Sequence, residues 1–103
     1  MQEFAEYIRN VRAFVSGDDI MSFKELLNKG AYLANISDES LAGYCKTAPG
    51  TVSRWKNGHS EPPEFSQKSI LEFCSGRVFF IVIAKLLADQ IFSEKEIAEC
   101  IGV

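Results

Sequence analysis

Apolar residues repeat at three- and four-residue intervals along most of this chain, and this spacing restricts the possible fold more than any other feature of the sequence. The repeat is clearest near the N-terminus, where the apolar positions are Phe4, Tyr7, Ile8, Val11, Phe14 and Val15. Charged and amide side chains fill the positions between them, as on the solvent face of an amphipathic helix. The spacing therefore predicts a helix over residues 2–15.

A second helix is predicted by its end signals. Ser22 and Glu25 have the spacing of a capping box, in which the serine hydroxyl and the glutamate carboxylate bind backbone amides at a helix N-terminus. This pair predicts a helix over residues 22–34, with Asn35 as its stop. Gly30 is a weak interior position that costs up to about 1 kcal/mol relative to alanine, unless close packing requires it.

Two shorter helices are predicted in the middle of the chain. Ser37 can cap a helix over residues 38–45, after which the sequence leaves a turn of three to four residues. Pro49 marks the start of the second short helix, because the missing amide of proline would be unpaired in a first helical turn anyway. The Asn57-Gly58 pair tolerates the left-handed conformation that ends a helix, and Pro62-Pro63 forces an extended exit.

The C-terminal part of the chain is the least regular. A fifth helix is predicted over residues 64–75, closed by Gly76. Residues 78–84 are apolar on every side, so periodicity does not separate a strand from a buried helix. We favour a helix that extends to about residue 91, because no partner strand is predicted elsewhere. A last capping box predicts a short helix from Ser93 to about Cys100.

The inward-facing side chains of the predicted fifth helix follow from the same spacing. They are Phe65, Ile70, Leu71, Phe73 and Cys74.

Length and composition indicate one folded domain without an enzyme's machinery. The 103 residues are 47% apolar, which suffices for a single core, and the longest apolar run is far shorter than the roughly 20 residues of a membrane span. Three scattered cysteines and one histidine provide neither a disulfide framework nor metal-ligand spacing. No nucleophile–base pair or glycine-rich phosphate loop occurs, so we expect no enzyme and no cofactor. Acidic residues near the N-terminus replace the basic start of a secretory signal, which favours a cytoplasmic protein.

The middle of the chain carries the one informative motif. A short helix, a tight turn, a second short helix and a proline-closed exit form the outline of a helix-turn-helix over residues 37–62. The segment 37–59 resembles, without a gap, the DNA-binding motif of the phage lambda repressor and Cro type, often called the Xre family. The matching positions are Leu41 and Ala42, the stretch from Thr51 to Trp55, and Asn57 and Gly58 followed by Pro62.

This resemblance implies the fold and its extent. We expect an all-α, lambda repressor-like helix-turn-helix bundle with an extra N-terminal helix and a short C-terminal helix. It would form one domain over residues 1–103, in which the family's core covers about residues 20–90.

The resemblance also implies which residues meet DNA. In this family the second helix of the motif lies in the major groove, and its first residues reach base edges. Arg54 has the sharpest chemistry for readout, because its guanidinium can bond O6 and N7 of guanine in a bidentate pair. Trp55 and Tyr44 are expected to face inward rather than to stack on bases. The DNA-binding positions implied by the family are Lys46, Thr47, Pro49, Gly50, Thr51, Ser53, Arg54, Lys56, Asn57 and His59.

The charge pattern agrees with this interpretation, although four positions depart from the family. Pro49 and Gly50 are two of them, and they replace side chains that would donate or accept at base edges. The net charge is −3, yet residues 46–60 contain three basic side chains and no acid, so the motif is the basic face of an acidic protein. Lys46 stands where the family usually has a turn glycine, and Asp38 stands where it commonly has a glutamine that helps to bind phosphate.

Residues 78–84 indicate a partner. A helix that is apolar on all sides can bury one face in its own core, but the other face needs the helix over residues 2–15 or a second subunit. We expect a homodimer with Val78, Phe79, Ile81 and Val82 at the interface.

Two functions remain from the sequence. The first is a sequence-specific regulator of transcription that binds double-stranded DNA, most simply as a repressor. The alternative is a protein-interaction module on the same scaffold, such as an antitoxin or a regulator's partner, with weak or no DNA binding.

Overall fold

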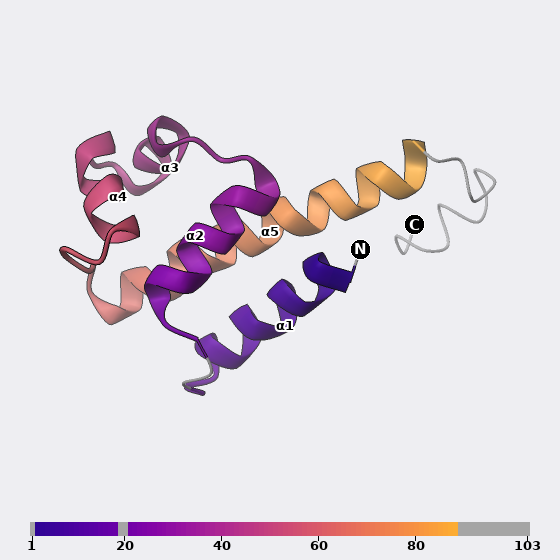
Figure 1. Cartoon of the computed structure of the whole chain (residues 1–103), viewed down its shortest axis with the longest axis horizontal. Helices are drawn as coiled ribbons and strands as arrows, with labels where there is room; N and C mark the ends of the chain where they lie inside the picture. Colours follow the sequence, from indigo (N-terminus) through magenta and orange to yellow (C-terminus); the bar gives the residue numbers. More distant parts are fainter. Residues whose placement is uncertain (1, 19–20, 89–103) are drawn as a thin grey trace.

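The computed structural model describes residues 2–18 and 21–88, and all regular structure in these ranges is helical (Figure 1). The helices are α1 (Gln2–Val15), α2 (Phe23–Ala34), α3 (Asp38–Cys45), α4 (Pro49–Lys56) and α5 (Glu64–Ala88). The predicted all-α class is therefore confirmed. The predicted helix over residues 93–100 and the extension to residue 91 lie outside the described residues.

The long helix α5 organises the molecule. It extends along most of the longest dimension, 47 Å, and α1 and α2 pack along it (Figure 1). The short helices α3 and α4 gather at the N-terminal end of α5, beside α2 (Figure 1). One end of the molecule thus carries the α3–α4 pair, and the other end is formed by α5 and α1.

The two predicted serine caps form as expected. The Ser22 hydroxyl accepts a hydrogen bond from the Glu25 amide at 3.2 Å, and the Ser37 hydroxyl accepts one from the Ser40 amide at 3.1 Å. The carboxylate of Glu25 differs from the capping-box prediction, since it accepts from the Ser22 hydroxyl at 3.1 Å.

The first four helices end in the same kind of turn. The chain passes through one left-handed residue after each helix, at Gly17, Asn35, Lys46 and Gly58. The next amide then donates to the carbonyl five positions earlier, at 2.9–3.0 Å. This Schellman pattern provides partners for carbonyls that a helix end leaves unpaired. The predicted stops at Asn35 and at residues 57–58 are confirmed.

The prediction of two helices separated at Gly76 is wrong, because α5 is continuous over 25 residues. Gly76 is exposed, and a Cβ atom there would meet nothing within 4 Å, so neither packing nor backbone conformation requires a break. An interior glycine weakens a helix by about 1 kcal/mol relative to alanine. Burial of Cys74 and Val78 on either side of it offsets this cost. The preference for helix over strand at residues 78–84 is confirmed.

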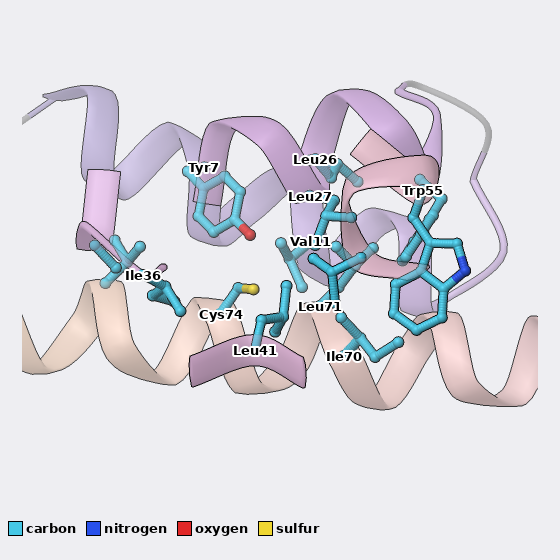
Figure 2. Close-up of a cluster of buried hydrophobic side chains, with 14 of the residues drawn as sticks. Tyr7, Val11, Leu26, Leu27, Ile36, Leu41, Trp55, Ile70, Leu71 and Cys74 are labelled. Carbon is cyan, nitrogen blue, oxygen red and sulfur yellow. The ribbon is translucent and has the colours of Figure 1, made fainter. Parts of the chain in front are cut away.

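The core lies where α5 meets the other four helices. Figure 2 shows how side chains from both halves of the chain converge there. Phe65 was predicted to face this core, but it is 82% exposed, because its helical position lies opposite the face of α5 that carries the buried Ile70, Cys74 and Val78. The largest fully buried side chains are Leu26, Leu27, Leu41, Val52, Leu71, Cys74 and Val78.

Gly30 allows α1, α2 and α5 to approach one another closely. A Cβ atom at this position would overlap the Tyr7 hydroxyl oxygen and would lie 2.7 Å from Tyr7 Cζ and 3.0 Å from Cys74 Cβ. The Tyr7 side chain occupies the space that a side chain at residue 30 would need, and its hydroxyl is buried without a hydrogen-bond partner among the described residues. Burial raises the pKa of Tyr7, so the phenol stays protonated. Close packing therefore explains the glycine that the sequence marked as a weak position.

Gly30→Ala should lower the free energy of unfolding by about 1–3 kcal/mol, because overpacking outweighs the better helix propensity of alanine. Tyr7→Phe alone should have a small effect, since the hydroxyl that it removes has no partner in the described structure. Urea unfolding of the wild type, both single variants and the double variant measures these effects.

The double variant should recover part of the loss, because the first atom that the new methyl group meets is gone. Strictly additive free energies would contradict the clash between residues 7 and 30.

Candidate nucleic-acid interface

The motif that the sequence singled out is a pair of eight-residue helices, α3 and α4, joined by residues 46–48. Lys46 turns the chain with φ 56°, and the Thr47 amide donates to the Ala42 carbonyl at 3.0 Å. Pro49 is the first residue of α4, as predicted, and Ala48 precedes it without a side-chain cap. A tight turn thus reverses the chain between two short helices.

One face of each helix is buried in the shared core. Leu41 and Val52 are fully buried, and Ala42, which is almost so, is small enough to let the two helices approach. Trp55 packs edge-on against Phe23 of α2, with ring centroids 6.5 Å apart and planes at 72°. The prediction that Trp55 faces inward is confirmed, and this contact fixes the outer helix α4 to α2.

The ten predicted DNA-binding residues all lie outside the core. Those of α4 follow helical spacing, so Gly50, Ser53 and Arg54 share the side opposite Val52 and Trp55. The surface of α4 therefore combines a basic side chain with small ones. The exposed members are Lys46, Pro49, Gly50, Arg54, Asn57 and His59, and the partly buried members are Thr47, Thr51, Ser53 and Lys56.

Lys56 is engaged within the protein. Its amino group forms an ion pair with the carboxylate of Asp38 at 2.5 Å, and both side chains are partly buried. The pair joins the last residue of α4 to the first residue of α3. It stabilises the angle between the two helices and offsets one of the three positive charges that the sequence assigned to the motif.

Helix α2 brings a lysine to this site that sequence reasoning missed. The Lys24 side chain lies against the exit turn of α4, where its Cδ and Nζ would be 3.3 Å and 3.5 Å from a Cβ atom at Gly58. Lys24 and Gly58 are far apart in the sequence, so only their helices' packing brings them together. The sequence does not distinguish Lys24 from Lys29, a second lysine on the same helix. In the structure the Lys29 amino group pairs with the Glu3 carboxylate of α1 at 2.9 Å.

Tyr44 differs from its prediction. It is 47% exposed rather than inward, and its ring stacks on Phe73 of α5 with centroids 4.0 Å apart. Arg77 extends the stack, with its guanidinium carbon 5.8 Å from the Phe73 centroid. Beside this stack, a shallow pocket lined in part by Thr47, Pro63 and Phe65 opens next to the α3–α4 turn.

The proposed interface residues of α5 fall into two groups. Val78 is fully buried within the protomer and belongs to its core. Phe79 is 56% exposed, and Ile81 and Val82 are partly buried. Phe80, which the sequence analysis did not assign, is the most exposed of this segment at 73%.

Helix α1 covers one side of this part of α5, where Lys85 Nζ lies 5.0 Å from the centre of the Phe4 ring. A groove of about 590 Å³ remains between the two helices, lined in part by Val15, Gly76 and Phe79. The N-terminal helix thus covers only part of the apolar surface of α5.

Other kinds of site find little support in the part of the chain that the structure describes. No group of three histidine, cysteine or acidic side chains there could hold a metal ion. No helix among the described residues is long and apolar enough to cross a membrane. Burial raises the pKa of Cys74 to about 12 and also raises the pKa of Cys45, which favours the protonated form of both thiols.

No family model, no curated protein and no solved structure matches this chain. Its function must therefore be inferred from its own residues.

Lys46→Gly should raise the free energy of unfolding by about 0.5–1 kcal/mol, because glycine adopts the left-handed conformation without the Cβ strain of lysine. Lys46→Ala keeps the Cβ atom while it removes the charge, and should give no such gain. Thermal or urea unfolding distinguishes the two. Equal stabilisation by both substitutions would assign the effect to charge instead of backbone strain.

Proposed function

We propose that this chain is a sequence-specific double-stranded DNA-binding protein that regulates transcription, with α4 as the helix that enters the major groove. The observation that carries the proposal is the division of α4 into two faces. Val52 and Trp55 fix one face in the core, while Arg54 and its small neighbours lie on the other. A short helix held this firmly by its partner helices suits rigid presentation of side chains to base edges.

The chemistry of the outer face assigns roles. Arg54 reads guanine through a bidentate pair, because its fork matches the O6 and N7 acceptors. Pro49 and Gly50 carry no side-chain donor, so they allow close approach of the helix rather than base readout. Thr47, Thr51 and Ser53 supply short hydroxyl groups around Arg54.

The remaining assigned residues contact the DNA backbone. Lys46 lies in the turn before α4, whereas Asn57 and His59 lie in the turn after it. Phosphate contacts at these positions would fix the register of the helix without adding sequence information.

We propose that a second copy of the chain covers the exposed part of α5. Trp55 of α4 lies beside Ile70, and Ile81, at the centre of the apolar segment, is 11 residues further along α5. At 1.5 Å per residue this separation is about 16 Å. Two antiparallel α5 helices that cross at Ile81 would therefore place their Ile70 residues about 33 Å apart along the helix axis, on the scale of the roughly 34 Å of one DNA turn.

This spacing supports a homodimer that reads an inverted repeat, in which each protomer contacts one half-site. Phe79, Phe80, Ile81 and Val82 would form the contact. Occupation of a promoter by such a dimer is the simplest route to repression.

A protein-interaction module is the second candidate, and two observations favour it. Asp38 offsets the charge of Lys56, and the exposed aromatic rings of Tyr44 and Phe65 lie beside the turn. Salt separates the two functions, because the affinity of phosphate contacts falls steeply with salt concentration whereas an apolar protein interface is much less sensitive.

Selection of duplexes from a random-sequence DNA library at low salt tests the proposed function. The wild type should enrich an inverted repeat, and Arg54→Ala should lose or relax the preference while the fold persists. Each lost bidentate contact removes about 1–3 kcal/mol of discrimination. Arg9→Ala, an exposed arginine on α1, is the matched control and should enrich the wild-type sequence.

Retention of the same enriched sequence by Arg54→Ala would overturn its role in readout. A wild type that retains no DNA would favour the protein-interaction module.

Phe79→Glu should convert the dimer into monomers, because it places a charge in the proposed apolar contact. Phe65→Glu changes a phenylalanine that is also exposed on α5 but lies at the other end of the helix, and it should leave the dimer intact. Sedimentation velocity over a range of concentrations measures both. An unchanged dimer in Phe79→Glu would place the interface elsewhere.

A further inference from the structure

We propose that Lys24 of α2 contacts the DNA backbone at the C-terminal end of α4, in place of Lys56, whose charge is held by Asp38. This inference rests on the proposed DNA-binding function and adds to the site a residue from outside the α3–α4 motif.

Gly58 gives Lys24 its position. The glycine has φ +77°, ends α4, and has no side chain, which leaves room for the aliphatic stem of Lys24 across the exit turn. The ammonium group therefore lies against the exit turn at Gly58, the turn that also contains Asn57 and His59, the residues assigned to the backbone after α4. Glu25, the acidic neighbour of Lys24 in the chain, is held by the Ser22 hydroxyl at the start of α2.

Asn28 fixes α2 against the end of α4. Its side-chain amide donates to the Lys56 carbonyl at 2.9 Å and to the Lys24 carbonyl at 3.0 Å. One amide group thus joins the first turn of α2 to the last residue of α4. The first turn of α2, which carries Lys24, is therefore fixed next to the end of α4.

Lys56 is the weaker candidate for the same role. Its amino group is paired with Asp38, and a phosphate would have to compete with that carboxylate. The pair adds no net charge to the surface, whereas Lys24 forms no ion pair with any described residue. Unpaired cations then lie before α4, at Lys46, and after it, at Lys24.

The two positions suit the groove. Helix α4 has eight residues and is therefore about 12 Å long. The major groove is about 12 Å wide, so lysine side chains next to a helix that lies in it are within reach of the phosphates that border the groove.

The test is the salt dependence of binding to mixed-sequence duplex DNA, because phosphate contacts are independent of sequence. The slope of log affinity against log salt should become shallower by about 0.9 in Lys24→Gln, the value expected for one lost phosphate contact. Lys29→Gln, on the same helix but paired with Glu3, should keep the wild-type slope.

Thermal unfolding of each variant separates this role from a structural one, since Lys24 could also favour the C-terminal dipole of α4. A purely structural role would change the melting temperature but not the salt slope, because the slope reports the number of phosphates contacted. A wild-type slope in Lys24→Gln would overturn the inference while the DNA-binding function stands. The absence of any salt-dependent DNA binding by the wild type would overturn both.

Discussion

The structure depends on the close contact of α2 with α5, which Gly30 makes possible. The absence of a side chain there brings the backbone of α2 to the Tyr7 ring and to Cys74, so three helices share one small region of the core. Leu26 and Leu27 become fully buried on the same helix. Because each buried leucine contributes about 1.5–3 kcal/mol, an increase in the α2–α5 distance would weaken most of the core together.

Helix α2 also determines where the candidate DNA-binding surface lies. Its first turns hold α4 through the Phe23–Trp55 ring contact and the bond from Asn28 to the Lys56 carbonyl. These contacts involve the N-terminal half of α2, whereas Gly30, further along the helix, packs against Tyr7 of α1 and Cys74 of α5. The same helix thus anchors the core and orients the outer helix, which couples the stability of the bundle to the geometry of the site.

The sequence was most informative where the determinants are local. Serine caps, left-handed stops and the proline at the start of α4 act within a few residues, and they placed α2, α3 and α4 nearly to the residue. It was least informative where the outcome depends on how far neighbouring helices reach. Tyr44 lies three residues after the buried Leu41 and yet is 47% exposed, and Lys24 reaches the site only through helix packing. Periodicity defines the faces of a helix, not what covers them.

On the proposed assignment, sequence specificity depends on α5 as much as on α4. Pro49 and Gly50 offer no side-chain donors to bases, and Lys56 is paired with Asp38, so one protomer has Arg54 and a few hydroxyl groups for direct readout. A single bidentate contact discriminates by about 1–3 kcal/mol, too little to select one site among many. Pairing through α5 doubles the contacts and adds a fixed spacing between half-sites. The apolar length of α5, which no other helix of the described residues fully covers, would then have a physical reason, because the proposed pairing would turn a weak reader into a selective dimer.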